Sequence, residues 1–309
     1  MQALENIARR LRGARSPGRG GPQLVQVMSD LHLEVGQQYE AFDFPAAGRL
    51  LVLAGDVGRL IDYEGYRGFL ERQAGRFERV FLVLGNHEFF GLGYEEGIAR
   101  AERLAREPAL RGRLVLLDRG VWADGESGSV IVGCTLWSHI PDPARAVVGS
   151  RVSDYRQIRG WSVDRHNQVH GEESAWLASA LQSLSEDRGR TDQQGRNILV
   201  VTHHAPSLAG TSAPEHAGNP WTPAFATDLL PDLQTGRVKT WVFGHTHHTT
   251  ELCCGGVRLV ANQRGYVLPG GRPETTTATT AQNTNTSWWP WARKPAVRPQ
   301  FDPERVVEL

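Results

Sequence analysis

Side chains that can bind metal ions or transfer protons are concentrated in a few short segments of this 309-residue sequence. Seven of the eleven histidines fall in four of these segments. Imidazole nitrogens, like carboxylate and amide oxygens, bind divalent cations and also take part in general acid–base catalysis. The distribution therefore indicates metal-dependent chemistry. The side chains concerned are Asp30, His32, Asp56, Asn86, His87, His203, His204, His245, His247 and His248.

Each segment alone has an ordinary explanation. Asp-x-His is commonly a solvated turn, Gly-Asp ends many strands, and Asn-His can cap a helix. Together, however, they would place two carboxylates, an amide oxygen and at least three imidazoles beside a hydrophobic core. Without a cation, that arrangement would carry a large desolvation cost. We therefore favour a metal cluster.

The donor types restrict the metal. A set of imidazole, carboxylate and amide donors without thiolate fits Mn, Fe, Zn, Co or Ni, and it is too rich in histidine for Mg or Ca. Seven probable ligands exceed what one ion accepts, and two cations about 3.5–4 Å apart need a bridging carboxylate. We expect two divalent metal ions, with manganese favoured, and Asp56 as the bridge.

Short apolar runs precede these polar segments, which is typical of buried strands, and several stretches between them have helical spacing. In an α/β sheet the carboxyl ends of the strands form the ligand crevice, so the polar loops should converge there. A second set of strands lies near glycine-containing turns and could pair antiparallel, which predicts a mixed sheet or two sheets rather than a purely parallel one. We expect strands at 24–28, 50–54, 80–84, 198–202 and 239–243, second-set strands at 114–117, 130–135 and 257–261, a last strand at 305–309, and helices over 66–74, 94–105 and 172–184.

Two segments lack the periodicity of a buried element. Residues 1–22 contain five arginines and one acidic residue, and we interpret them as a disordered lead-in, with an organellar leader as the alternative. Residues 271–299 are rich in Thr, Ala, Asn and Gln and include three tryptophans. We interpret them as a low-complexity insertion whose tryptophans anchor the loop, close over a ligand or contact a partner. The rest, 23–309, is expected to form a single domain.

Composition excludes several classes of protein. The 34 basic and 34 acidic residues give a formal charge of zero, which makes nucleic acid an unlikely main partner. Three cysteines provide no disulfide framework and suggest a reducing, cytoplasmic location. No apolar run approaches the roughly 20 residues that a membrane helix needs. The oligomeric state stays open.

The motifs resemble, in order and in strand context, the signature of the calcineurin-like metallophosphoesterase superfamily. Shorter stretches at 135–137, 154–156, 224–229 and 262–266 resemble a widespread, mostly uncharacterised branch of it. The resemblance covers residues 24–270 and the final strand, but neither 1–22 nor 271–299. The matching residues are Asp30-x-His32, Gly55-Asp56, Gly85-Asn86-His87-Glu88, His203 and Gly244-His245-Thr246-His247.

The resemblance implies an α/β fold, a four-layer α/β/β/α sandwich with mixed sheets. It also implies a small phosphate-ester substrate, a mono- or diester, that a hydroxide bridging the two metals attacks directly, with Asp56 and His87 as the catalytic residues. A non-catalytic metal-binding scaffold and a nuclease are the alternatives; the complete ligand set disfavours the first and the neutral charge the second. The implied ligands are Asp30, His32, Asp56 and His247 for one metal and Asp56, Asn86, His203 and His245 for the other, with His87 contacting the phosphate.

Substrate-binding residues are harder to identify. His203 and His204 are adjacent, so on an extended backbone they point in opposite directions and only one should bind metal. We choose His203, which leaves His204 beside the ligands or in the pocket and His248 as a solvated neighbour. Trp137 is a further pocket candidate, but it could instead be a core residue. Arg156 could instead form an ion pair on the surface. The candidate substrate-binding residues are His204, Tyr155, Arg156 and Arg264.

Overall fold

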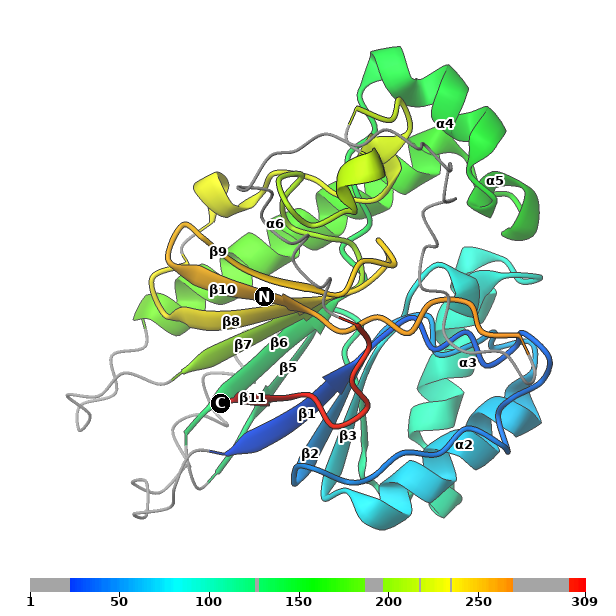
Figure 1. Ribbon diagram of the computed structural model, residues 1–309, viewed down its shortest axis with the longest axis vertical. Helices are drawn as coiled ribbons and strands as arrows, with labels where there is room; N and C mark the ends of the chain where they lie inside the picture. Colours follow the sequence, from blue (N-terminus) through cyan, green and yellow to red (C-terminus); the bar gives the residue numbers. More distant parts are fainter. Residues whose placement is uncertain (1–22, 126–127, 187–196, 217, 234, 269–299) are drawn as a thin grey trace, which may run out of the picture.

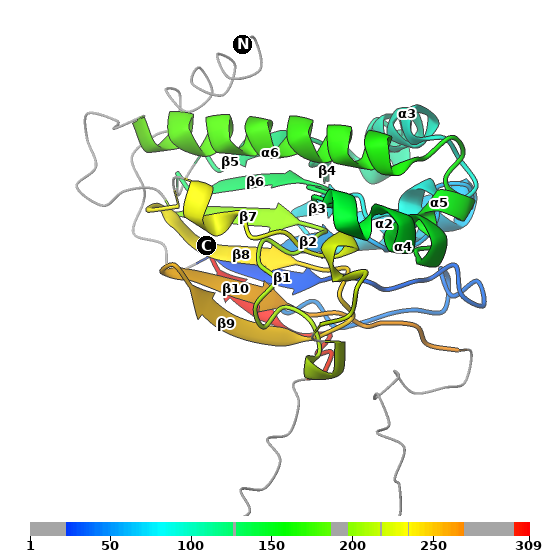
Figure 2. The ribbon, with the colours of Figure 1, turned by 90° about the horizontal axis from the view of Figure 1, so that it is seen from above.

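Two β-sheets pack face to face and carry helices on both outer faces (Figure 1, Figure 2). The computed structural model describes residues 23–125, 128–186, 197–216, 218–233, 235–268 and 300–309. Within them, the mixed sheets and flanking helices confirm the expected α/β sandwich. The lead-in at 1–22 and the insertion at 271–299 lie outside the described residues, so their interpretation and the single-domain assignment stay predictions.

The first sheet has the strand order β11-β1-β2-β3-β4. Strands β1 to β4 pair in parallel, whereas β11 pairs antiparallel with β1. Because β1, β2 and β3 run in the same direction, the loops that follow them leave the sheet at one edge. The strands are β1 (Leu24–Met28), β2 (Leu50–Ala54), β3 (Arg79–Val83), β4 (Leu114–Leu116) and β11 (Val306–Glu308).

The second sheet has the order β5-β6-β7-β8-β10-β9. Its four central strands are parallel neighbours, and β5 and β9 are antiparallel at the two edges. The loops after β7 and β8 therefore also leave the sheet together. The strands are β5 (Gly120–Ala123), β6 (Val130–Cys134), β7 (Ile198–Thr202), β8 (Val238–Phe243), β9 (Thr250–Cys254) and β10 (Val257–Ala261).

Helices α2 and α3 cover the first sheet, and α6 covers the second (Figure 1). Short helices occur in the connections, several of them beside the polar loops. The α-helices are α2 (Tyr63–Arg76), α3 (Tyr94–Ala105), α4 (Arg145–Arg151), α5 (Asp154–Gln157) and α6 (Val163–Glu186). The 3₁₀ helices are η1 (His87–Phe89), η2 (Pro108–Leu110), η3 (Asp142–Ala144), η4 (Pro214–His216), η5 (Thr222–Ala224) and η6 (Leu230–Asp232).

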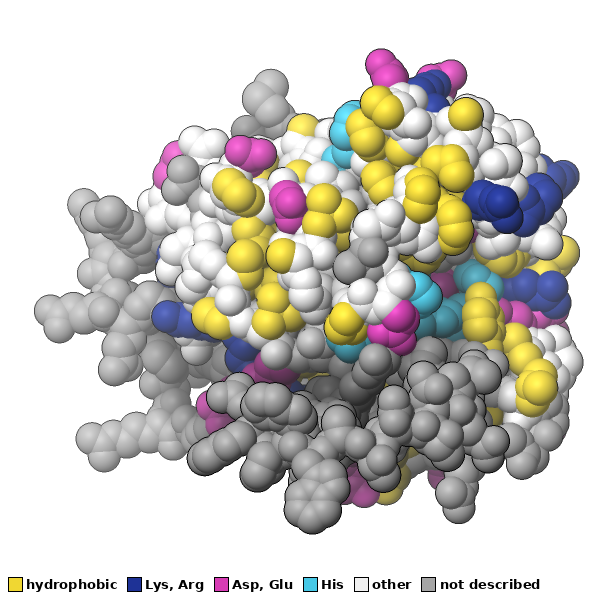
Figure 3. Space-filling model, turned by 45° about the horizontal axis from the view of Figure 1, so that its top comes forward, with side chains coloured by type: hydrophobic (Ala, Val, Ile, Leu, Met, Phe, Trp, Pro, Cys, Tyr) yellow, Lys and Arg dark blue, Asp and Glu magenta, His cyan; other side chains and the backbone are white. Residues whose placement is uncertain are grey.

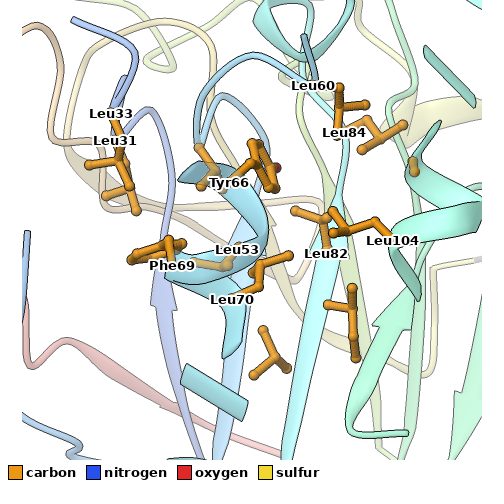
Figure 4. Close-up of a cluster of buried hydrophobic side chains, with 14 of the residues drawn as sticks. Leu31, Leu33, Leu53, Leu60, Tyr66, Phe69, Leu70, Leu82, Leu84 and Leu104 are labelled. Carbon is orange, nitrogen blue, oxygen red and sulfur yellow. The ribbon is translucent and has the colours of Figure 1, made fainter. Parts of the chain in front are cut away.

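The strands bury both of their faces, which explains why they are continuous apolar runs. In β2, Leu50, Val52 and Ala54 pack between the sheets, while Leu51 and Leu53 face the helices. Figure 4 shows this outer core, in which Leu53 and Leu82 lie among side chains of α2 and α3. A rigid core of this kind fixes where each strand ends, and so fixes where the polar loops begin.

All nine expected strands agree with the structure to within one residue at each end, but one pairing direction and two helix starts differ from expectation. β4 is parallel to β3 rather than antiparallel, whereas β6 and β10 each have one antiparallel neighbour. Helix α6 begins at Val163, well before 172, because its first turns bury polar side chains such as His166 and His170, which conceal the apolar periodicity. Helix α2 likewise starts at Tyr63 rather than 66.

Besides the short 3₁₀ helices, two α-helices and two strands were not predicted. Helices α4 and α5 are short, and strands β5 and β9 are only half-buried edge strands, so their sequences carry little hydrophobic pattern. Among the described residues, no helix is both long and apolar enough to cross a membrane.

Glu173 on α6 is an unusual core residue. Its side chain is 1% exposed, and neither carboxylate oxygen has a hydrogen-bond partner among the described residues. Burial, followed by repulsion from Asp118, raises the pKa of Glu173 to about 8, although Arg119 opposes the shift. The neutral acid is therefore the form that the folded chain favours at neutral pH.

We expect the Glu173 carboxyl to make stability pH-dependent. Between the ordinary glutamate pKa and about 8, the unfolded chain ionises this group while the folded chain does not, so its contribution to stability is lost as pH rises through that range. Glu173→Gln should remove this part of the pH dependence of the unfolding free energy, and the variant should be more stable than wild type at the upper end of the range. Urea unfolding across it measures the effect, with Glu172→Gln on the exposed face as control. An unchanged slope in Glu173→Gln would contradict the assignment.

Candidate metal centre

The loops after β1, β2, β3, β7 and β8 meet at one end of the sandwich, as the parallel strands require. Histidine side chains gather there in a hollow on the face shown in Figure 3. All seven predicted metal ligands come together at this end. They are Asp30 and His32 after β1, Asp56 after β2, Asn86 after β3, His203 after β7, and His245 and His247 after β8.

The first ligand group consists of Asp30, His32 and His247, whose donor atoms all lie within 4.8 Å of one another. His32 Nε2 is 2.9 Å from His247 Nε2, and His247 Nε2 is 3.5 Å from Asp30 Oδ1. Asp56 Oδ2 lies 3.8 Å from His32 Nε2 and completes the group. Several donors aimed at the same small volume are what a divalent cation requires.

The second group consists of Asp56, His203 and His245. Asp56 Oδ2 is 3.4 Å from His203 Nε2, and Asn86 Oδ1 is 3.2 Å from the same nitrogen. The same carboxylate oxygen of Asp56 therefore faces both ligand groups. That is the position of a bridging ligand between two cations.

The charges of the ligands fit cations as well. Asp30 and Asp56 are 0% and 1% exposed. Burial raises the pKa of Asp30, whereas for Asp56 the neighbouring His203 and His87 outweigh burial and lower the pKa. Burial also opposes protonation of His203, but Asp56 dominates and raises its pKa to about 10. The proton on His203 thus compensates buried carboxylates, a role that a cation would take over.

His245 and His247 show the opposite behaviour. Loss of solvent around the rings, followed by the charge of His203 for His245 and of His32 for His247, lowers the pKa of both imidazoles, that of His247 to about 3 although a third of its side chain is exposed. Both rings are therefore neutral at physiological pH, which is the form of histidine that binds metals.

Five of the ligands have a left-handed backbone. Positive φ angles occur at Asp30 (53°), His32 (47°), Asp56 (51°), His245 (70°) and His247 (48°), half of the ten non-glycine residues with positive φ among those described. Such conformations cost roughly 1–3 kcal/mol each and persist where the surroundings impose them. Here they turn each loop sharply so that its side chain points back over the strand ends.

Glycine is required where ligands pass close to the backbone. A Cβ on Gly244 would lie 2.6 Å from Asp30 Oδ2 and 2.9 Å from Ala54 O, and one on Gly85 would collide with Asp56 Oδ1. Both positions admit no larger residue without moving a ligand. This explains physically why the Gly-His and Gly-Asn-His motifs begin with glycine.

We expect the strain at His247 to be measurable. In protein freed of metal by a chelator, His247→Gly should be more stable than His247→Ala by about 1 kcal/mol, because glycine adopts positive φ without steric cost. Urea unfolding of the two variants compares them. Ala175, exposed in α6, provides the control, since Ala175→Gly should lose about 1 kcal/mol. An alanine variant at 247 as stable as the glycine variant would disprove the strain.

Glu88, quoted in the sequence motif without a role, holds two of the loops together. Its fully buried carboxylate accepts hydrogen bonds from the backbone N–H groups of Asp56 (2.9 Å) and Gly85 (2.7 Å). It also accepts from Val57 N–H (2.8 Å) and the Tyr66 hydroxyl (2.9 Å). The loops after β2 and β3 are thereby fixed relative to each other, and Asp56 with them.

Two further carboxylates were missed by the sequence analysis. Glu34 Oε1 lies 2.8 Å from His87 Nδ1 and 3.3 Å from His32 Nδ1. Asp154 Oδ1 accepts a 2.7 Å hydrogen bond from Asn86 Nδ2, which leaves Asn86 Oδ1 directed at His203. Both orient residues of the site. The available signals were the position of Glu34 on the loop of His32, and the stretch at 154–156 already noted.

His87, which the resemblance places at the phosphate, also forms a third candidate ligand group with His32 and Asp56, whose donor atoms lie within 4.8 Å of one another. Its backbone N–H donates to Asp56 Oδ1 (2.9 Å), and its Nε2 is 3.2 Å from the Tyr266 hydroxyl. Burial disfavours the charged ring, but Asp56 and Glu34 outweigh this and raise the pKa of His87 to about 9. For Glu34, the bonds to the two histidines outweigh burial and lower its pKa to about 2.

Four of the predicted metal ligands line a cavity of about 420 Å³ together with His87; they are Asp56, Asn86, His245 and His247. Residues 151–154, at the end of α4 and the start of α5, form one part of its wall, and residues between 212 and 225 form another. Tyr266 completes the rim. Neither of the two wall segments was predicted to contribute.

The four candidate substrate-binding residues do not line this cavity. Arg156 is exposed and donates to the Ser150 carbonyl, while the Tyr155 hydroxyl lies 3.3 Å from His166 Nδ1. Arg264 donates to the Leu31 carbonyl and to Gln38 Oε1, so structural contacts occupy its guanidinium.

The pocket candidates His204 and Trp137, and the predicted ligand neighbour His248, lie in the interior or next to a ligand loop. His204 is 0% exposed and packs on His245 with ring centroids 4.1 Å apart. It therefore lies behind the ligands, away from the cavity. Trp137 is fully buried against Trp161, which bears out its core interpretation. His248 is half-buried beside the last ligand loop.

Comparisons with known proteins agree with this geometry. The chain belongs to the calcineurin-like phosphoesterase family, whose model matches residues 25–249. It is therefore a metallophosphoesterase-type hydrolase with candidate sites for the divalent metals that this family uses.

Individual relatives are distant. The uncharacterized protein L509 of Acanthamoeba polyphaga mimivirus is 21% identical over 266 residues, which cover 79% of this chain and 91% of that protein. The phosphopantetheinyl hydrolase PptH of Mycobacterium tuberculosis has a TM-score of 0.56 at 19% identity, covering 82% of this chain and 91% of its own. A dimetal phosphatase from Danio rerio is 12% identical, with a TM-score of 0.45 over 78% of this chain and 87% of that one. The likeness to PptH shows a shared fold.

Proposed function

We propose that this protein hydrolyses small phosphate mono- or diesters at a centre of two divalent cations. The observation that carries the proposal is the position of Asp56, whose Oδ2 faces both ligand groups. Manganese is the favoured metal, and Fe, Zn, Co and Ni suit the same donors. One cation would be held by Asp30, His32, Asp56 and His247, and the other by Asp56, Asn86, His203 and His245.

Two bound cations would supply positive charge for the phosphoryl oxygens and a water that is activated near neutral pH. The protein's own part is to position these charges. Asp56 fixes the separation of the two sites, and Glu88 fixes Asp56 through its backbone N–H. Asp154 orients the Asn86 amide so that its oxygen, not its nitrogen, faces the centre.

His87 is suited to assist the departure of the leaving group. The Nδ1–H group of His87 donates a hydrogen bond to Glu34. The other ring nitrogen, Nε2, is therefore the one that faces the cavity and Tyr266. A protonated Nε2 could donate to a phosphoryl oxygen or to the leaving alkoxide. Help of this kind contributes typically 10²–10⁴-fold.

A small substrate fits the described surface better than a long nucleic acid. The cavity of about 420 Å³ is the size of a small-molecule site, and the formal charge of zero provides no excess of basic residues for a phosphate backbone. We also propose a cytoplasmic location, which is supported by three free cysteines, one of them exposed.

Replacement of Asp56 and of His87 should have different consequences. Asp56→Asn is expected to lose metal and nearly all activity, because the shared carboxylate is gone. His87→Ala should keep the metal of the wild type but turn over substrate about 10²–10⁴-fold more slowly. Elemental analysis of protein loaded with Mn, Ni, Co or Zn gives the metal content of each variant.

Turnover is assayed with p-nitrophenyl phosphate beside bis-p-nitrophenyl phosphate, which separates monoesterase from diesterase activity. Arg145→Gln, a change in an exposed ion pair, serves as the handling control. Wild-type activity in Asp56→Asn, or loss of metal in His87→Ala, would show that the roles are assigned incorrectly.

A further inference from the structure

Arg151, the last residue of α4, occupies an unusual position in the cavity wall. Its guanidinium carbon lies 5.9 Å from the centre of the Trp221 ring, which also lines the cavity. No acidic partner and no hydrogen bond engages this guanidinium among the residues that the structure describes. Arg145, on the same helix, is by contrast paired with Asp164.

The acids of the cavity do not neutralise Arg151. Asp56 belongs to both ligand groups, and Asp154 accepts its hydrogen bond from Asn86. Both carboxylates therefore act at the metal end of the cavity. A positive charge at the other wall is left to interact with whatever occupies the space between.

Two other residues of the cavity wall are of a kind that binds anions. His216 and Asn219 lie on the wall segment that carries Trp221, and the Asn219 side-chain oxygen accepts the Trp221 backbone N–H at 3.3 Å. The amide nitrogen of Asn219 thus stays a donor. The cation–π contact of Arg151 with Trp221 uses none of the guanidinium N–H groups, which leaves them available for a carboxylate or a phosphate.

We propose that Arg151 and Trp221 form a subsite for a second anionic group on the organic part of the substrate. This inference rests on the proposed phosphoesterase function and narrows it to esters that carry a further carboxylate or phosphate. The metal centre would bind the phosphoryl group that reacts, and Arg151 the group that does not. A guanidinium pairs with either anion through parallel N–H···O bonds.

A matched series of substrates tests the subsite in the metal-loaded, full-length protein. Each is a p-nitrophenyl alkyl phosphate diester with the same leaving group and one of three chain ends: carboxylate, phosphonate or the neutral carboxamide. Several alkyl lengths are used so that the end can reach Arg151. The measured quantity is the ratio of kcat/KM for the charged ester to that for its carboxamide partner.

For wild type, this ratio should reach its maximum of about fivefold at one chain length, mainly because the charged ester has the lower KM. The ratio should decrease when salt is added. Arg151→Gln should bring the ratio to about one, and Arg151→Lys should keep part of it. Arg145→Gln should leave the ratio as in wild type. A preference confined to the carboxylate or to the phosphonate series supports the subsite and identifies its anion.

Two results would overturn the inference. One is a wild-type ratio of about one at every chain length while all esters are hydrolysed. The other is a ratio that persists in Arg151→Gln protein with normal metal content. If wild type hydrolyses none of the esters, nor bis-p-nitrophenyl phosphate or p-nitrophenyl phosphate, the proposed phosphoesterase function itself fails, which separates the two claims.

Discussion

The burial of the Asp56 carboxylate is the constraint on which the rest of the site depends. An acid that is 1% exposed needs positive charge nearby, and here imidazoles of both ligand groups surround it. The backbone is arranged to keep it there: φ is 51° at Asp56, Glu88 binds its N–H, and His87 N–H donates to its side chain. The loops after β2 and β3 have few alternative conformations as a result.

This local strain is sustained by the core. The strands that lead into the site are apolar on both faces and packed against helices on one side and the opposite sheet on the other. Left-handed ligand residues and buried carboxylates each reduce stability, and close packing of the sandwich offsets them. A site built on strand ends can therefore hold charged groups in fixed positions that a flexible loop could not.

The parts of the structure that follow from the sequence are those with strong local signals. Continuous apolar runs such as Leu50–Ala54 identified the central strands, and the polar residues that follow these strands, together with the family resemblance, indicated candidate ligands that the fold brings together. Both signals are local in the chain. They reflect constraints that act on adjacent residues, namely burial on both faces of a strand and the geometry of a metal site.

The parts that could not be predicted depend on contacts between distant segments. Nothing adjacent to Arg151 in the sequence indicates that it meets Trp221 in the cavity wall, and Arg156, a few residues away, is an equally plausible candidate until the fold is known. Glu34 acquires its role only when His87 is brought beside it. Helix α6 was underestimated because buried polar residues such as His166 interrupt its apolar pattern.

The most direct test of the shared role of Asp56 is a crystal structure of manganese-loaded protein with anomalous scattering measured at the manganese edge. We expect two anomalous peaks, about 3.5–4 Å apart, one on each side of the Asp56 carboxylate. A single peak, or two peaks of which only one is bound by Asp56, would contradict the proposed dinuclear centre.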